Sequence, residues 1–195
     1  MKKYSGFTTK TAESLLLNAG AYFKNLEISE DGTIESFEDA VAAGKLLGAT
    51  RGGGEFSAVP EVRQIEVDGV AGRAKGLEVI DSWDVYIKAT ILEITEDTLA
   101  TALCASETET GTTHDKITAK NSIELTDYIG NIAWVGTLSG SDKPVVIVVY
   151  NAINTDGLVM TTTDKNEASI GTTFYGHYTQ DDLDHPPFEI YYPKN

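Results

Sequence analysis

The sequence has few of the residues that build catalytic or metal sites. Its 195 residues include one cysteine, Cys104, which excludes an internal disulfide framework. We expect Cys104 to be a small buried hydrophobe rather than a reactive thiol. None of the three histidines, His114, His177 and His185, has a second His or Cys at the spacing of metal ligands. We therefore predict no metal and no cofactor.

Long hydrophobic runs are also missing. The longest, Val145 to Tyr150, is far shorter than the roughly 20 apolar residues of a membrane-spanning helix. The N-terminus has basic residues, but no apolar run follows them, so it is not a signal peptide. We expect no membrane span.

Basic residues are scarce relative to acidic ones. Lysine and arginine number 15 against 30 aspartates and glutamates, which gives a formal net charge of −15. A groove that binds nucleic acid needs a basic patch for phosphate, so this balance argues against one. An acidic surface past which DNA moves without binding is compatible with the charge, and so is an ordinary solvated surface.

Catalytic motifs are incomplete. Gly136 to Gly140 (GTLSG) misplaces the serine of the G-x-S-x-G elbow by one position. The glycine-rich stretch from Gly48 to Gly54 lacks the G-K-[ST] ending of a phosphate-binding loop. Asp181, Asp182 and Asp184 are not surrounded by an EF-hand pattern. These observations predict a protein that is not an enzyme.

One long strand dominates what is present. Trp83 to Thr95 contains neither Gly nor Pro and is rich in β-branched and aromatic residues. Alternate positions form an apolar face: Trp83, Val85, Ile87, Ala89 and Ile91. After Ile91 the alternation reverses, which places Leu92 and Ile94 on the other face. Either a β-bulge causes the reversal, or the strand leaves its own core there and pairs with a neighbouring subunit.

A short helix follows this strand. Thr95 is a suitable N-cap, and Glu96 and Asp97 place negative charge in the first turn, where the helix dipole favours it. Leu99, Ala102 and Leu103 form a narrow apolar stripe. A helix of about ten residues needs a sheet to pack against.

The remaining pattern is that of strands joined by turns, which is typical of an antiparallel sandwich or barrel. We predict about nine strands, a hairpin turn at Asn154 to Gly157, and one domain over residues 21–195. Residues 1–20 form either an arm that becomes ordered on assembly or, over Thr11 to Ala19, a short helix. The other predicted strands are Ala21–Ile28, Val62–Val67, Lys116–Leu125, Ile132–Leu138, Val145–Ile153 (apolar on both faces), Leu158–Thr163, Ala168–Thr179 and Phe188–Tyr192.

Two segments read as flexible excursions, Thr33 to Gly54 and Gly69 to Ser82. Long excursions are uncommon in compact domains unless they make contacts. Contacts with other subunits are one interpretation, and solvated loops are the other. The candidate contact residues are Arg51, Gly52, Gly53, Gly54, Arg73 and Lys75.

Three segments together resemble the phage tail tube proteins (major tail proteins) of phages and prophages of Gram-positive bacteria. The first, around Lys45 to Gly76, contains GKLLGATRGGGEF, VRQIEVDGV and GRAKG. The second is the strand and helix of Ile91 to Leu103. The third consists of KPVVIVVYNAINTDGL and TFYGHYTQDDLDHPPFEIYYP in the C-terminal half.

The resemblance implies two packed antiparallel sheets flanked by a helix, with subunits in six-membered rings that stack into a hollow tube. DNA would pass through the lumen without specific binding. One excursion would line the lumen and the other would join the rings, and Leu92 and Ile94 would lie on a strand between subunits. Such a protein is assembled in the host cytoplasm, resides in the virion, and meets tape measure, tail-tip and tail terminator proteins.

The sequence leaves other assignments open. A contractile tail, a non-contractile tail and a tail-like bacteriocin would all use a similar tube. The alternative function is a β-sandwich binding module for carbohydrate or a cell-surface partner. That module would need an exposed aromatic platform, for which Trp83, Trp134 and the Tyr191–Tyr192 pair are the candidates.

Overall fold

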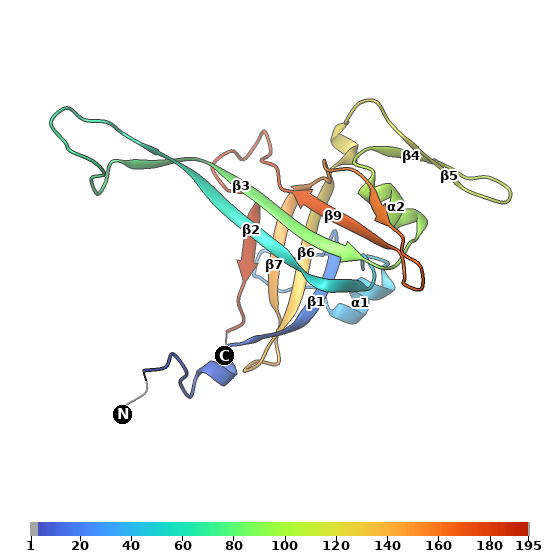
Figure 1. Ribbon diagram of the computed structural model, residues 1–195, viewed down its shortest axis with the longest axis horizontal. Coiled ribbons are helices and arrows are strands. Elements are labelled where there is room, and N and C mark those ends of the chain that lie inside the picture. The colour runs from blue at the N-terminus through green and yellow to red at the C-terminus, as the bar shows by residue number, and fades with distance from the viewer. Residues whose placement is uncertain (1–3, 195) are drawn as a thin grey trace.

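The computed structural model describes residues 4–194 and is mainly β. Two four-stranded antiparallel sheets pack against each other, as predicted, and a separate two-stranded ribbon and a long hairpin project from them (Figure 1). The described residues form ten strands and two α-helices, one strand and one helix more than the sequence predicts.

The first sheet has the order β1-β6-β7-β10, and every neighbouring pair is antiparallel. β7 is central, and most of its residues are buried because both faces of the sheet are covered. The prediction of a strand that is apolar on both faces is therefore confirmed. The bounds are Leu16–Lys24 for β1, Ile129–Leu138 for β6, Val145–Ala152 for β7 and Phe188–Tyr191 for β10.

The second sheet has the order β2-β3-β9-β8 and is also antiparallel. β2 and β3 form a hairpin that is much longer than the other strands of the sheet. The bounds are Thr50–Gln64 for β2, Glu78–Ile91 for β3, Val159–Thr161 for β8 and Ser169–Tyr175 for β9.

The main core lies between the sheets. Ile87 and Phe174 of the second sheet meet Ile132 and Val149 of the first, and each is at most 1% exposed. The other face of the first sheet has its own cluster, which includes Phe23, Ala133 and Val148 and is covered by α1 (Phe37–Ala42). Alternate residues of β6 and β7 thus enter two different cores.

The two-stranded ribbon consists of β4 (Ser106–Glu109) and β5 (Lys116–Ala119). It follows α2 (Glu96–Ala102) and projects from the end of the molecule opposite the long hairpin (Figure 1). Two single 3₁₀ turns, η1 (Thr11–Glu13) and η2 (Leu125–Asp127), complete the elements.

A half-buried ion pair ties the ribbon to the body. The ammonium of Lys120, just after β5, lies 2.5 Å from the Asp127 carboxylate, which also accepts the Glu124 N–H at 2.8 Å. These two contacts, the Lys120 hydrogen bond first, hold the pKa of Asp127 below its usual 3.8. The ionised carboxylate therefore stabilises the folded state above pH 4, and this contribution is lost as the pH falls through the lowered pKa.

We expect Asp127→Asn to reduce the free energy of unfolding at pH 7 by about 1.5–3 kcal/mol, the range for hydrogen bonds to charged groups. The difference from the wild type should shrink as the pH falls below 4, because the wild-type carboxylate becomes protonated. Urea denaturation at pH 7 and pH 2.5 measures both values. A difference that is the same at both pH values would contradict the assignment.

The apolar face of the long strand is confirmed, but its predicted end is wrong. Val85, Ile87, Ala89 and Ile91 are buried, and their neighbours are not. β3 stops at Ile91, so within the chain the reversal of alternation coincides with the end of the strand and not with a bulge, and pairing with a neighbouring subunit stays a prediction. The chain turns there because Thr95 caps α2, and its side chain accepts the Thr98 N–H.

The segment from Thr33 to Gly54, predicted as a flexible excursion, contains more regular structure than that prediction implies. Its middle forms α1, and its last residues, including Arg51 to Gly54, already belong to β2. Thr50 pairs with Ile91 and Gly54 with Ala89, so the β2 strand carries two extra residues in a bulge. Gly52 and Gly53 adopt the left-handed φ values that this bulge requires, 78° and 74°.

The N-terminal and C-terminal connections differ from the predictions as well. Residues 16–20 belong to β1, where Leu16 pairs with Leu138, so the alternative of a helix over Thr11 to Ala19 is wrong.

Asn154 to Gly157 does not close a hairpin. Both edges of β7 are occupied by β6 and β10, and the chain crosses there to the second sheet.

Candidate assembly surfaces

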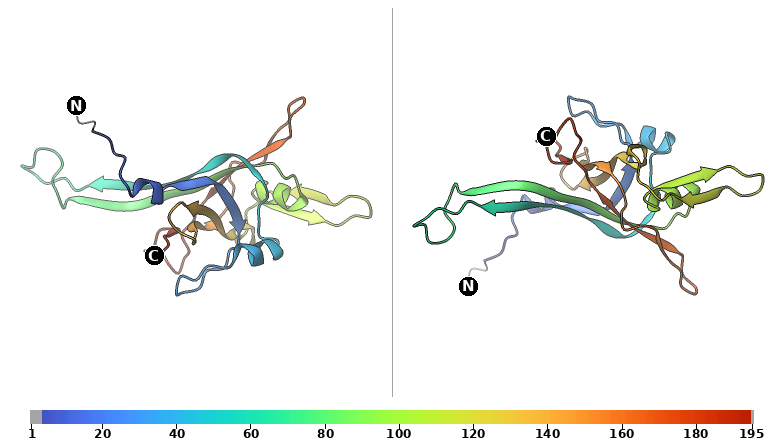
Figure 2. Two further views of the ribbon diagram at one scale, coloured as in Figure 1. Left: turned by 90° about the horizontal axis from the view of Figure 1, so that it is seen from below. Right: turned by 90° about the horizontal axis from the view of Figure 1, so that it is seen from above.

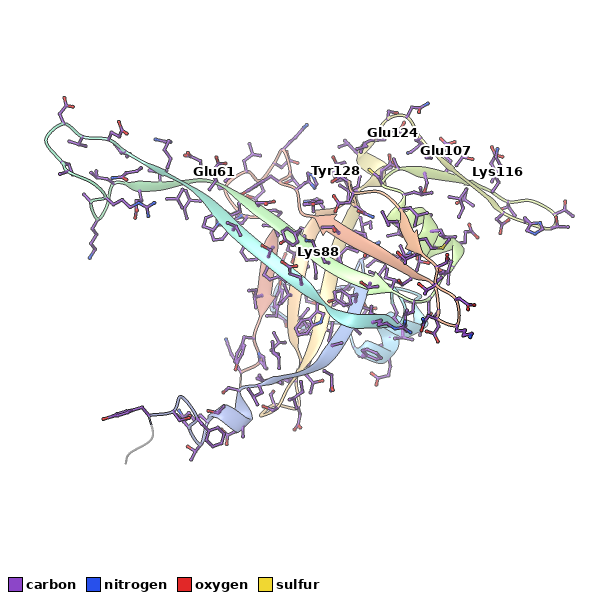
Figure 3. All side chains as sticks on the ribbon, viewed as in Figure 1. Glu61, Lys88, Glu107, Lys116, Glu124 and Tyr128 are labelled. Carbon is purple, nitrogen blue, oxygen red and sulfur yellow. The ribbon has the colours of Figure 1, made fainter. Side chains whose placement is uncertain are left out.

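The β2–β3 hairpin extends well beyond the body. We call its outer part, residues 59–82, the hairpin arm (Figures 1 and 2). Glu61 lies on this arm, whereas Lys88 lies over the body (Figure 3). Seven aliphatic side chains of the arm are exposed, by 38–55%: Val59, Val62, Ile65, Val67, Val70, Val79 and Ile80.

The hairpin arm has backbone edges that no other described strand occupies. β9 pairs with β3 only from Tyr86 to Ile91, so the outer part of β3 has β2 as its sole strand partner. β2 in turn pairs only with β3. Exposed edges and exposed aliphatic side chains together are features that soluble chains normally avoid unless another chain covers them.

A cross-strand ion pair keeps the arm in register. The Arg63 guanidinium donates to both carboxylate oxygens of Asp81, at 2.9 and 3.1 Å. The Asp81 hydrogen bond raises the pKa of Arg63. Nearby, the Ser82 hydroxyl donates to Glu61 at 3.0 Å.

Arg73 and Lys75 lie in the loop at the tip of the hairpin arm, and their contact with another subunit stays a prediction. Both are exposed, and neither has an ion-pair partner among residues 4–194. Gly69, Gly72 and Gly76 of the same loop have left-handed φ values, which shape its turns.

Arg51 does not join them. It lies at the opposite end of β2, where its guanidinium pairs with Glu167 in the connection between β8 and β9. This contact lowers the pKa of Glu167. Gly52, Gly53 and Gly54 lie beside it in the β2 bulge, so the six candidate contact residues fall into two separate groups.

Leu92 and Ile94 lie in the short connection from β3 to α2. Leu92 is half-buried, and its N–H donates to the Ala49 carbonyl at 2.8 Å. Between them, the Glu93 carboxylate accepts the Ala49 N–H at 2.8 Å. Of these two residues Ile94, at 41% exposure, offers the larger apolar surface to a neighbour, and the intersubunit strand stays a prediction.

The two tryptophans do not form an exposed platform. Trp134 is half-buried and donates its indole N–H to the Ala19 carbonyl at 2.8 Å. Trp83 packs against Phe188 with a centroid separation of 5.6 Å. Of the Tyr191–Tyr192 pair, Tyr192 is exposed, whereas Tyr191 is half-buried and donates its hydroxyl to Glu189.

The sequence reasoning missed the apolar character of the hairpin arm. The signal was present in the β-branched residues Val59, Val62, Val79 and Ile80, which flank the loop on both sides. It also missed the exposed leucines at the start of β1, Leu15 to Leu17, and the exposed Tyr4 and Phe7 before them.

The described residues offer no metal site and no membrane-spanning helix. Among residues 4–194, no three His, Cys, Asp or Glu side chains gather as a metal site would require. Asp182, in the acidic cluster, accepts instead from the His185 ring at 2.7 Å. Burial raises the pKa of the Cys104 thiol, and Asp127 adds to this effect. None of the described helices is long and apolar enough to cross a membrane.

Comparison of the chain with models of known protein families gave no match, and comparison with curated proteins gave none either.

Proposed function

We propose that the chain is a structural subunit that assembles with copies of itself into stacked rings, which form the hollow tail tube of a phage or phage-like particle. The observation that carries the proposal is the hairpin arm, with seven exposed aliphatic side chains and unoccupied backbone edges. Such a surface is costly in an isolated chain and is accounted for when neighbouring copies cover it.

The charge is consistent with this role. A formal net charge of −15 makes the surface repel the phosphate backbone, which suits a channel that must let DNA pass without holding it. The ring size of six, the virion location, and the tape measure, tail-tip and tail terminator partners enter the proposal through the resemblance in the sequence.

Negative-stain electron microscopy of the purified chain, at low and at high concentration, tests the proposal directly. Rings or hollow tubes with a central channel would support it. Small separate particles at every concentration would count against self-assembly by this chain. They would favour the binding-module alternative, which a glycan screen would then examine.

The tip of the hairpin arm provides a second test. We expect the double substitution Arg73→Glu and Lys75→Glu to raise the concentration at which tubes appear by about tenfold, because charge complementarity between copies is lost. Light scattering during a dilution series measures this concentration. Arg51→Glu is the comparison, since Arg51 already pairs with Glu167 of its own chain.

If the Arg73/Lys75 variant forms tubes at the same concentration as the wild type, the tip loop does not take part in the contact between rings. A larger effect of Arg51→Glu would move that contact to the bulge of β2.

A further inference from the structure

The N-terminal segment carries two aromatic side chains with almost no cover. Tyr4 is 97% exposed and Phe7 is 75% exposed. The hydrogen bonds of residues 4–9 are local, as in the 2.8 Å bond from the Thr8 N–H to the Thr11 hydroxyl. We call residues 4–10 the aromatic arm.

The N-terminal ten residues, which include the aromatic arm, also differ in charge from the rest of the chain. The first ten residues contain three lysines and no acidic residue, although the chain as a whole has a net charge of −15. The rest of the chain is therefore strongly acidic, and an acidic surface on another copy would attract these residues.

An open groove lies elsewhere on the same chain, with a volume of about 790 Å³. It runs between residues 31–37, the end of β10 and the residues that follow β10. Phe23 and Leu26 form its buried floor, and Phe37, Ile190 and Tyr192 line it although they are 50–63% exposed. We call it the C-terminal groove.

The floor of the groove favours an aromatic occupant. Phe23 and Phe37 already meet edge to face, with a centroid separation of 5.4 Å. A further ring beside the exposed Phe37 would extend this pair in the geometry that aromatic rings prefer.

The charges on the rim have both signs. Lys143 and Lys194 lie there, as does the exposed carboxylate of Asp31, which has no ion-pair partner among residues 4–194. Glu35 is already paired with Lys45 at 2.8 Å. Asp31 is thus the rim carboxylate available to a lysine of the arm.

We propose that the aromatic arm of one copy inserts Tyr4 and Phe7 into the C-terminal groove of a neighbouring copy. This inference rests on the proposed self-assembly and names one of its contacts. The arm does not fill its own groove, because none of residues 4–10 lines it, and the arm and the C-terminal segment lie on different sides of the long hairpin (Figure 2). The two rings would bury about 300–500 Å² of arm surface, a small contact that gains strength by repetition around a ring.

Disulfide trapping in the full-length chain tests the contact. Phe7→Cys is combined with Ile190→Cys in a chain whose own thiol is removed by Cys104→Ser, and the protein is oxidised under assembly conditions. We expect intermolecular dimers and higher species on a non-reducing gel, about fivefold more than with Phe7→Cys and Leu125→Cys, because a disulfide needs its Cα atoms within about 7 Å. Leu125 is a demanding control because it is 87% exposed and far more accessible.

A synthetic peptide of residues 1–12 should reduce this cross-linking when added in excess. The same peptide with Tyr4→Ala and Phe7→Ala keeps all three lysines and should not, which separates ring insertion from simple charge attraction. If Ile190→Cys does not fold, Tyr192→Cys, two residues further along the same segment of the groove, takes its place.

Cross-linking no stronger than in the Leu125 control, or a disulfide formed within one chain, would overturn the proposal. Micrographs of the same sample separate the two hypotheses. If tubes form but the disulfide does not, the arm contact is wrong and the proposed function stands. If neither tubes nor the disulfide form, the result counts against the arm contact and against the proposed function.

Discussion

A chain that carries Val62→Asp together with Ile80→Asp is expected to fold but to form no rings or tubes. The two residues face each other across the hairpin arm and are 51% and 53% exposed. In a separate chain the new carboxylates remain hydrated, so we expect the free energy of unfolding to change by no more than about 1 kcal/mol. In an assembly they would be buried without partners, at a cost of several kcal/mol for each charge.

Sedimentation velocity and electron microscopy measure the loss of assembly, and thermal unfolding measures the retained fold. The control is Ile123→Asp with Leu125→Asp, which places the same two charges on exposed aliphatic positions outside the hairpin arm. Tubes from the arm variant would show that its aliphatic surface is not covered by another copy. Equal loss in both variants would attribute the effect to charge alone.

We expect Gly54→Ala to lower the free energy of unfolding by about 2–3 kcal/mol, near the upper end of the range for overpacked sites. A Cβ at Gly54 would lie 1.8 Å from the hydroxyl oxygen of Tyr22 and 2.3 Å from the Lys88 carbonyl oxygen. Tyr22 is only 2% exposed and cannot simply swing away, and the carbonyl belongs to the paired strand β3. The melting temperature of a chain of this size should fall by about 5–10 °C.

Two companion variants make this prediction specific. Gly171→Ala, in β9, should be neutral because no atom lies within 4 Å of its added Cβ. Tyr22→Phe should restore part of the stability of Gly54→Ala by removing the closer of the two atoms. If Gly54→Ala has the melting temperature of the wild type but fails to assemble, Gly54 would instead be a contact residue.

Much of the second sheet could be predicted because its signals are local. The alternation from Trp83 to Ile91 follows from the period of a strand that is buried on one face, and every buried position was predicted correctly. The N-cap at Thr95 is equally local, since it depends on one side chain and the N–H three residues later.

The glycine-rich stretch from Gly48 to Gly54 was predicted incorrectly because glycines are typical of two different structures. Gly52 and Gly53 provide the left-handed φ values of a bulge inside a strand, and the same residues are typical of a mobile loop. Gly54 is needed for a third reason, the close approach of the Tyr22 side chain from β1, which only the folded chain reveals.

The sequence also does not show which strands pair with each other in the sheets. The turn residues Asn154 to Gly157 look like those of a hairpin, but β7 pairs with β6, which precedes it, and with β10 near the end of the described residues, and not with the strand that follows the turn. The candidate contact residues also fall into those that local signals place and those that only the fold places. Arg73 and Lys75 lie at a hairpin tip, which local turn signals predict, whereas the Arg51 contact with Glu167 depends on how β2 meets the β8–β9 connection.

The pairing of β1 also bears on the order in which the chain folds during its synthesis. β2 and β3 follow each other in the chain and can pair as soon as both leave the ribosome, but Leu16 of β1 must wait for Leu138. Long-range pairings of this kind form slowly. A nascent chain therefore presents the apolar hairpin arm before its first sheet is complete, and crowded or overheated synthesis should divert such chains to aggregates.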